Sequence, residues 1–281
     1  MTTATTATTA HPSAAPSPSS LSLGLRRVRI ELKTFFRDRN SAVWNFLLPV
    51  LLLVIFGSVF GNQDIGPGIT FAQYFVAGMI ASGVLYTSFQ NLAIGIPQER
   101  DEGTLKRLEG TPMPKAAYFI GKIGLVAVTY VGQLCVLMIV GRLLYGVHVP
   151  ATAARWLTLL WVSVLGLISC TLLGLAFSSV PRNGKGASAV VSPIVLLLQF
   201  TSGVFFVYSG LPSWMQHFAS VFPLKWLAQG MRYVFLPDSA AAVEVSGSFE
   251  LPKVAMVLAA WSVGGLLLAL RFFRWRSRND G

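Results

Sequence analysis

The sequence is short of charged residues. Asp, Glu, Lys and Arg make up 12% of its 281 residues, whereas hydrophobic residues make up 53%. An ordinary soluble domain carries about 25% charged residues. Several apolar runs are also long enough to cross a bilayer as helices, which takes about 20 residues each. The composition therefore excludes an ordinary soluble domain and predicts an all-α integral membrane protein.

Residue sets that carry out catalysis or bind metals are missing as well. The three histidines are far apart and lack metal-ligand spacing, and the two cysteines fall inside apolar runs. No Ser-His-Asp or Cys-His set is suggested. Neither Gly121-Lys122 nor Gly184-Lys185 has the flanking residues of a phosphate-binding loop. The sequence therefore predicts no enzyme, no metal site and no cofactor bound by this chain.

The cations exceed the acids, and the net charge is +11. In a soluble protein this excess would suggest nucleic-acid binding. Here the cations flank apolar segments, which is the usual topology signal of a membrane protein. We therefore expect membrane lipid, and no nucleic acid, among the partners.

Residues 1–20 consist almost entirely of Thr, Ala, Ser and Pro and predict a disordered tail. Residues 21–40 predict an amphipathic helix that lies in the lipid headgroup layer. The alternative, a surface helix of a soluble domain, is disfavoured because no soluble core follows. The apolar face holds Leu21, Leu25, Val28, Leu32, Phe35 and Phe36, and the other faces carry cations that include Arg26, Arg29, Lys33 and Arg37.

Residues 41–275 predict a domain of six membrane-spanning helices, and residues 276–281 a short cytoplasmic tail. The spans are expected at about 43–61, 71–96, 117–141, 156–180, 187–207 and 254–272. Most of the 22 Lys and Arg residues fall before the first span, in the even-numbered connections and after the last span. The positive-inside rule then places both termini in the cytoplasm.

Residues 208–253 form one long segment on the outer side. Apolar residues recur at helical spacing on both sides of Pro223, and each stretch is too short to cross the membrane. Two short helices that lie at, or dip into, the outer leaflet are therefore expected. Trp214 and Trp226 suit the membrane interface.

The densest run of charge, residues 98–109, separates the second and third spans. Each ionised group at a bilayer centre costs about 2.5–3.5 kcal/mol even on the mildest scale, so this run must project into water. By the charge rule above, that water is the cytoplasm. Gly103 permits a sharp turn there, and Thr104 is expected to cap a short helix that follows. For each acid, a simple solvated surface role is the alternative to a binding role.

No charged residue falls in the middle of any predicted span, which argues against an ion-coupled carrier. Uncharged polar and aromatic residues remain as candidates to line a translocation path, and hydrogen bonding between helices is the alternative role for the polar ones. The candidates are Phe46, Gln90, Asn91, Gln199, Phe200 and Thr201.

Three motifs together resemble the membrane subunit of type-2 ABC exporters, over about residues 25–275. The first is Glu99-Arg100-Asp101-Glu102-Gly103-Thr104-Leu105-Lys106-Arg107-Leu108, followed by Thr111-Pro112 and Gly121-Lys122. The others are Ser209-Gly210-Leu211-Pro212 with Trp214, and Phe222-Pro223-Leu224 with Gly230-Met231-Arg232. Within the family, the chain looks most like daunorubicin-type drug exporters and nodulation-factor permeases, and both subgroups remain open.

The resemblance implies a six-span permease in a bacterial inner membrane. It also implies a dimer, with a second copy or a similar permease, and two separate ATPase subunits that hold ATP and Mg. Residues 25–40 would brace a cytoplasmic coupling helix that docks in the ATPase. The residues carried over to that coupling role are Glu99, Arg100, Asp101, Glu102, Gly103, Thr104, Leu105, Arg107 and Leu108.

A hydrophobic drug, a lipid or a glycolipid is the expected substrate, because the spans are rich in aromatic residues. Two other functions stay open at this point: an ion-coupled secondary carrier, and a membrane-embedded enzyme that modifies lipids. The first needs ionisable residues within the spans. The second needs a nucleophile or a metal cluster at one leaflet.

Overall fold

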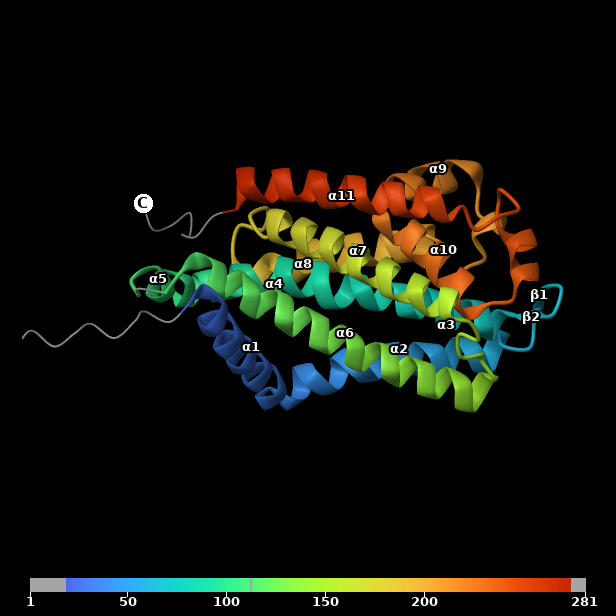
Figure 1. Ribbon diagram of the computed structural model, residues 1–281, viewed down its shortest axis with the longest axis horizontal. Coiled ribbons are helices and arrows are strands. Elements are labelled where there is room, and N and C mark those ends of the chain that lie inside the picture. Colours follow the sequence, from blue (N-terminus) through green and yellow to red (C-terminus); the bar gives the residue numbers. More distant parts are fainter. Residues whose placement is uncertain (1–18, 112, 274–281) are drawn as a thin grey trace, which may run out of the picture.

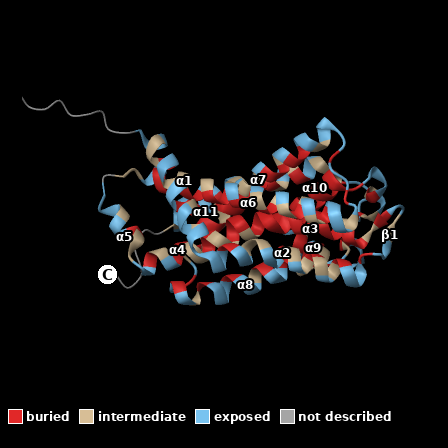
Figure 2. Ribbon diagram, turned by 90° about the horizontal axis from the view of Figure 1, so that it is seen from below, coloured by how far each residue is buried: buried red, intermediate tan, exposed pale blue. Residues whose placement is uncertain are grey.

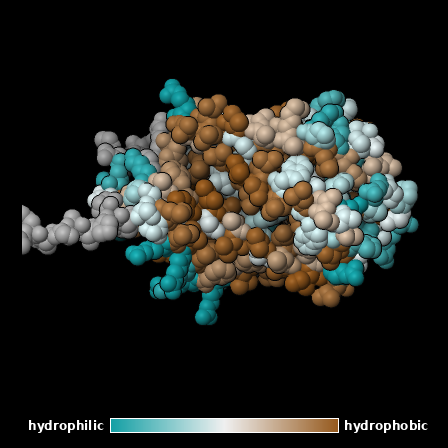
Figure 3. Space-filling view, in the orientation of Figure 1, coloured by the Kyte–Doolittle hydropathy of each residue, from teal (hydrophilic) through white to brown (hydrophobic). Residues whose placement is uncertain are grey.

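The computed structural model describes residues 19–111 and 113–273, and it is a bundle of long helices that run side by side (Figure 1). The predicted all-α membrane fold is confirmed, because six helices are long and apolar enough to cross a membrane. These are α2 (Arg39–Phe60), the continuous helix Phe71–Asp101, α6 (Lys115–Tyr145), α7 (Ala153–Phe177), α8 (Gly184–Thr201) and α11 (Leu251–Phe272). Each overlaps one predicted span. A broad hydrophobic surface separates the two more hydrophilic ends (Figure 3).

The shorter elements gather at the two ends of the bundle (Figure 1). One end, here called the α5 end, carries α5 (Thr104–Glu109) and the first part of α1 (Ser20–Arg37). The opposite end, here called the hairpin end, carries the two-stranded hairpin β1 (Asp64–Gly66) and β2 (Ile69–Thr70). The other short elements are η2 (Tyr208–Gly210), α9 (Ser213–Val221), α10 (Pro223–Phe235) and η3 (Asp238–Val243). The predicted tails, 1–20 and 276–281, lie outside the described residues, apart from Ser19 and Ser20, which cap and begin α1.

The second span is the most buried of the six (Figure 2). It consists of α3 (Phe71–Val84), the π-helical turn η1 (Leu85–Gln90) and α4 (Asn91–Asp101). It begins at a capping box in which Thr70 and Gln73 bond each other's backbone. At 1.5 Å per residue its 31 residues reach roughly 46 Å, more than the ~30 Å of hydrocarbon. Its last turn therefore extends beyond the apolar layer at the α5 end.

Helix α10 lies inside the bundle, packed against α3, α7 and α11. Every residue of α10 except Tyr233 is buried. Trp226, which we predicted at the membrane interface, is 7% exposed, and its indole N–H donates to the Ser220 carbonyl oxygen at 2.7 Å. That prediction was wrong because the helix buries all its faces, whereas the sequence suggested only one. Trp214 in α9 is exposed, and its place at the membrane interface stays a prediction.

Lys225 of α10, outside the six spans, is buried and donates to the Gln229 side-chain oxygen at 2.5 Å. Burial lowers the pKa of Lys225 from its ordinary 10.5 to about 8. The folded chain therefore loses this proton at a lower pH than the unfolded chain, and stability rises with pH between these two values. Relative to Lys225→Met, we expect the free energy of unfolding to rise by about 1.4 kcal/mol from about pH 7 to about pH 9. Thermal unfolding in detergent measures it, and a gap between the two proteins that is the same at both pH values would contradict it.

Candidate functional site

Helix α1 packs closely against the first half of α6, at the α5 end. Glycines make this approach possible. A Cβ atom on Gly121 would lie 2.4 Å from Cγ of Arg27, and one on Gly124 would lie 2.3 Å from Cγ2 of Val28. Real Cβ atoms do not approach so closely. The contact therefore brings the charged residues of α1 directly onto α6.

Four charged side chains meet at this contact, in a cluster here called the junction: Arg27 and Glu31 of α1, Glu99 of α4 and Lys122 of α6. The Lys122 Nζ atom lies 2.9 Å from Oε2 of Glu31 and also pairs with Glu99. Arg27 Nη2 lies 2.7 Å from Oε1 of Glu31. The Tyr118 hydroxyl donates to Oε2 of Glu99 at 2.9 Å. Three segments far apart in the sequence are thus joined by charge.

The junction is balanced in charge and largely buried, and its Arg27 and Glu99 side chains keep 15% and 23% exposure. Glu31 is 6% exposed and Lys122 is 5% exposed. The aromatic ring of Tyr118 lies beneath both cations, at 5.9 Å from Cζ of Arg27 and 5.5 Å from Nζ of Lys122. Two carboxylates face two cations, so each buried charge has a partner. Buried pairs of this kind are costly to break, because the remaining charge is left without compensation.

The sequence analysis missed Glu31 and Lys122 as functional residues. Two signals were available. Glu31 is the only acid in α1, and Lys122 is a cation within the otherwise apolar run of α6. A cation in an apolar run, such as Lys122, indicates an acidic partner elsewhere in the fold, and a single acid on a basic helix is a candidate for it.

The end of α4 is tied to two further spans. The Arg100 Nη1 atom donates to the carbonyl oxygen of Ser178, which caps the end of α7, at 3.1 Å. The Asp101 carboxylate accepts a hydrogen bond from the backbone N–H of Gly184, the first residue of α8, at 2.6 Å. A carboxylate at a helix N-terminus satisfies an unpaired donor and suits the helix dipole. Arg100 and Asp101 therefore hold the second span to α7 and α8.

Helix α5 follows directly from α4 through a glycine turn. Gly103 has φ +71°, a conformation that favours glycine, as predicted. The prediction that Thr104 caps α5 was wrong: Gly103 occupies the N-cap position, Thr104 is the first helical residue, and no side chain bonds the cap. Leu105 is fully buried among residues that include Leu92 and Tyr118. This leucine anchors α5 to the bundle.

The other face of α5 is open to solvent. Glu102 and Arg107 are exposed, Leu108 is half-buried, and Arg107 Nη2 donates to the Glu102 carbonyl oxygen at 3.1 Å. A polar groove of about 640 Å³ runs along the contact between the end of α4 and the start of α8. Its lining residues are Gln98, Asp101, Glu102, Asn183, Gly184 and Lys185.

The nine residues predicted to contact an ATPase do not all face outward. Glu99, Arg100, Asp101 and Leu105 bind the chain's own spans, whereas Glu102 and Arg107 point outward. The inner set can stiffen the α5 end, and the outer set can contact another molecule. The predicted coupling role is divided between them.

Comparison with known proteins identifies the family of the chain. Residues 27–236 match the model of the ABC-2 type transporter family. The chain belongs to that family. It is 25% identical to the inner membrane transport permease YadH of Escherichia coli over 240 residues, which cover 82% of this chain and 91% of YadH. It is also 27% identical to the putative transport permease ycf38 of Porphyra purpurea over 204 residues, covering 71% and 69% of the two chains. It is 21% identical to the putative transport permease YvfS of Bacillus subtilis over 201 residues, which cover 71% of this chain and 80% of YvfS.

Membership of the ABC-2 family makes this chain the transmembrane component of an ABC transporter. The family is a membrane transport component, in agreement with the prediction that the chain itself is not an enzyme. Among residues 19–111 and 113–273, the structure shows no cluster of His, Cys, Asp and Glu able to hold a metal ion.

In this ABC-2 chain, the cations predicted for the interface helix lie on the outside of α1. Arg26, Arg29, Lys33 and Arg37 are all exposed. Leu21 and Leu25 are exposed as well, at 62% and 60%. The helix therefore presents both a basic surface and an apolar surface beyond its contact with α6, which is the pattern of a helix in a headgroup layer.

The candidate path residues are only partly brought together. Gln199 of α8 is buried and accepts a hydrogen bond from the Tyr86 hydroxyl of η1 at 3.1 Å. Half-buried Gln90 ends η1, and half-buried Asn91 begins α4. Phe46 contacts Gly132 of α6 and Phe35 of α1 instead. For the remaining two, the Phe200 ring centroid lies 4.8 Å from that of Phe205, and the Thr201 hydroxyl donates to its own helix at the Leu197 carbonyl oxygen.

Proposed function

We propose that this chain is the transmembrane subunit of an ATP-driven exporter, in which two separate ATPase subunits dock on the α5 end. The observation that carries the proposal is the rigid connection of α5 to the spans. Leu105 fixes α5 to the bundle, and the junction joins the second span to α6 and α1. A force on α5 is therefore transmitted to several spans at once.

The α5 end faces the cytoplasm in this proposal. It carries the exposed cations of α1, together with Arg107, Arg182, Lys185 and Arg271. An excess of cations at one end is the topology signal of the cytoplasmic side. The membrane in this proposal is a bacterial inner membrane, because the relative YadH of Escherichia coli is named an inner membrane permease.

The groove beside α5 offers an ATPase a surface of mixed charge. Glu102 on one side and Lys185 on the other are exposed. In the proposed cycle, ATP draws the two motor subunits together, and α5 with the end of α4 moves as one body. The spans tied to that body by Asp101, Arg100 and the junction follow.

A second permease, either another copy or a similar chain, completes the route. The α8 span leaves polar Ser188 and Ser192 exposed along its length. Exposed hydroxyls in a span gain from contact with another helix, because lipid offers them no partner. The route would then run between the two permeases. A hydrophobic drug, a lipid or a glycolipid suits the exposed aromatic residues of the hairpin half, such as Phe60 and Phe206.

The test reverses the exposed charges of the coupling surface. We expect the double variant Glu102→Lys and Arg107→Glu to fold and insert normally, because both side chains are exposed. Its stimulation of the cognate ATPase in proteoliposomes is expected to fall at least about tenfold, because like charges then face the motor. ATP hydrolysis with and without the permease measures the effect.

A matched control reverses Asp64, an exposed acid at the hairpin end, to Lys and should leave stimulation unchanged. If the Glu102/Arg107 variant stimulates the ATPase fully, these two residues do not form the surface that contacts it. ATP hydrolysis by the purified permease alone would overturn the two-component function.

A further inference from the structure

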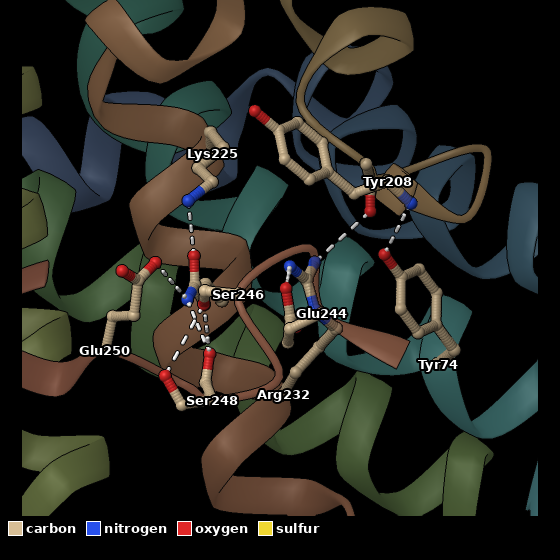
Figure 4. A network of polar contacts seen from close by, with 10 residues as sticks. Tyr74, Tyr208, Lys225, Arg232, Glu244, Ser246, Ser248 and Glu250 are labelled. Atoms are coloured by element: carbon tan, nitrogen blue, oxygen red, sulfur yellow. Dashed lines mark hydrogen bonds and ion pairs between the residues drawn. The ribbon is translucent and has the colours of Figure 1, made fainter. Parts of the chain in front are cut away.

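A fully buried ion pair lies at the hairpin end, outside the coupling site. Arg232 of α10 is 0% exposed, and its Nε and Nη2 atoms lie 2.5 Å and 3.0 Å from the two carboxylate oxygens of Glu244 (Figure 4). The Glu244 side chain is 4% exposed. This two-point contact is the strongest geometry available to an arginine and a carboxylate.

Arg232 also connects segments that come from elsewhere in the chain (Figure 4). Its Nη1 atom donates to the Gly203 carbonyl oxygen at 3.4 Å, just beyond the end of α8. Its guanidinium lies 4.8 Å from the ring centroid of Tyr74 in the second span. The Tyr74 hydroxyl in turn accepts from the backbone N–H of Tyr208 at 3.0 Å. One side chain thus holds the hairpin ends of two spans and α10 together.

Glu244 belongs to residues 236–250, here called the return segment, which connects α10 to α11. The segment covers the hairpin end, where Leu236, Ala240 and Phe249 form an apolar cluster with Ile69 and Tyr74. It also touches the β-hairpin, since the Ser239 hydroxyl donates to the Pro67 carbonyl oxygen at 3.0 Å.

The second cation of α10, Lys225, is connected to the return segment through Gln229. Lys225 donates to the side chain of Gln229, whose amide nitrogen lies 3.3 Å from the Ser248 carbonyl oxygen and 3.5 Å from Glu250 Oε2 (Figure 4). Both buried cations of α10 are therefore compensated by the return segment. If the segment lifted, Arg232 would lose Glu244, Gln229 would lose its contacts with Ser248 and Glu250, and both buried cations would need water.

An ion pair differs from an apolar contact in the states that it allows. An apolar pair is favourable only when it is dry. Two charges are stable when they are paired in a dry site, and also when water hydrates each of them in an open site. Because the cost of removing water from a buried pair offsets much of its attraction, the closed and open states differ less in free energy. A segment that only had to stay closed would be held at least as well by apolar residues. The choice of charges at positions 232 and 244 fits a segment that opens.

We propose that the Arg232–Glu244 pair is a latch: it holds the return segment closed over the hairpin end, and it opens during the transport cycle to admit water and give the substrate its exit. The opening step rests on the proposed function. The latch itself does not, and the two can be tested separately.

The reporter for opening is a cysteine at Ala240, which is 3% exposed in the return segment. It is placed in a background with Cys135 and Cys170 changed to Ala, and its reaction with a membrane-impermeant maleimide is timed. Without nucleotide or ATPase, we expect slow labelling in this parent and at least tenfold faster labelling after Glu244→Gln. The control Asp238→Asn also removes a charge from the return segment, but Asp238 is exposed and pairs with Arg155 of α7. We expect it to leave the labelling rate unchanged. Equally slow labelling of Glu244→Gln would overturn the latch.

The second arm adds the cognate ATPase and ATP to the parent in lipid nanodiscs, which leave both faces of the membrane open to the maleimide. We expect labelling of position 240 to rise at least fivefold during ATP turnover, and to stay slow with ATP alone. Unchanged labelling while the complex hydrolyses ATP would overturn the opening step. Absence of any permease-stimulated hydrolysis would instead count against the proposed function, and the first arm would still decide on the latch.

A third variant covers the case in which Glu244→Gln fails to fold. The apolar pair Arg232→Met with Glu244→Leu fills the same space without an unpaired charge. We expect it to fold, to label slowly without nucleotide, and to stay slow during ATP turnover, because an apolar pair gains nothing from water. Acceleration equal to that of the parent would overturn the role of the ion pair in opening.

Discussion

Replacing Lys122 by Met is expected to destabilise the chain by about 3–5 kcal/mol, the usual result of removing one partner from a buried ion pair. The change leaves two carboxylates, buried Glu31 and half-buried Glu99, with only Arg27 to balance them. The midpoint of thermal unfolding in detergent should fall well below that of the wild type. Stimulation of the cognate ATPase should fall with it, because the ion pairs of Lys122 that connect α1 and the second span to α6 are then lost.

Two further variants distinguish loss of charge balance from loss of the side chain itself. Adding Glu99→Gln to Lys122→Met restores one acid to one cation, and we expect it to recover at least half of the lost stability. The matched control Lys33→Met removes an exposed cation of α1 and should change the free energy of unfolding by less than about 0.5 kcal/mol. A Lys122→Met chain that unfolds at the wild-type temperature would show that the junction does not hold these helices together.

The spans and α5 could be predicted from the sequence because each depends on local information. A backbone in lipid must satisfy its own hydrogen bonds, so a long apolar run can only be a helix. The turn at Gly103 is equally local, since few other residues adopt its positive φ. The short strands β1 and β2 were not predicted, because Ile69 and Thr70 adjoin the apolar run of the second span and give no separate strand pattern.

The direction in which the charges of the coupling run point could not be predicted. Glu99 and Asp101 were expected to face a partner, but they bind Lys122 and the start of α8. A charge next to an apolar run is most simply placed in water. Only the fold shows that Lys122 and Glu31, which are 91 residues apart, meet in a largely buried site with Glu99.

The burial of α10 was missed for a related reason. The helical spacing of its apolar residues suggested a helix with only one buried face, although its two cations, Lys225 and Arg232, are buried as well. The residue that allows Arg232 to be buried, Glu244, lies 12 positions further on, in a stretch that looked like a polar loop. Sequence periodicity reports which side chains prefer water. It does not report which charges a later segment will neutralise.

Arg232→Met alone is therefore expected to cost about 3–5 kcal/mol, because it leaves Glu244 buried, charged and without its counter-ion. Glu244→Leu alone should be comparably harmful, since it leaves the arginine unpaired beneath the return segment. The double variant should unfold within about 1 kcal/mol of the wild type, or be more stable, because replacing a whole buried pair by apolar residues is often neutral or stabilising. Unfolding of all four proteins in detergent gives the coupling energy of the pair.

The size of that coupling decides what the pair is for. If the two single variants are damaged and the double variant is not, the ion pair adds little net stability to the closed fold, and its charges must serve another state. A double variant that is as unstable as the sum of the singles would contradict this. Arg232 would then act through its contacts with Gly203 and Tyr74, which Met cannot replace, rather than through its charge on Glu244. The comparison thus separates a device that opens from a rigid structural support at the hairpin end.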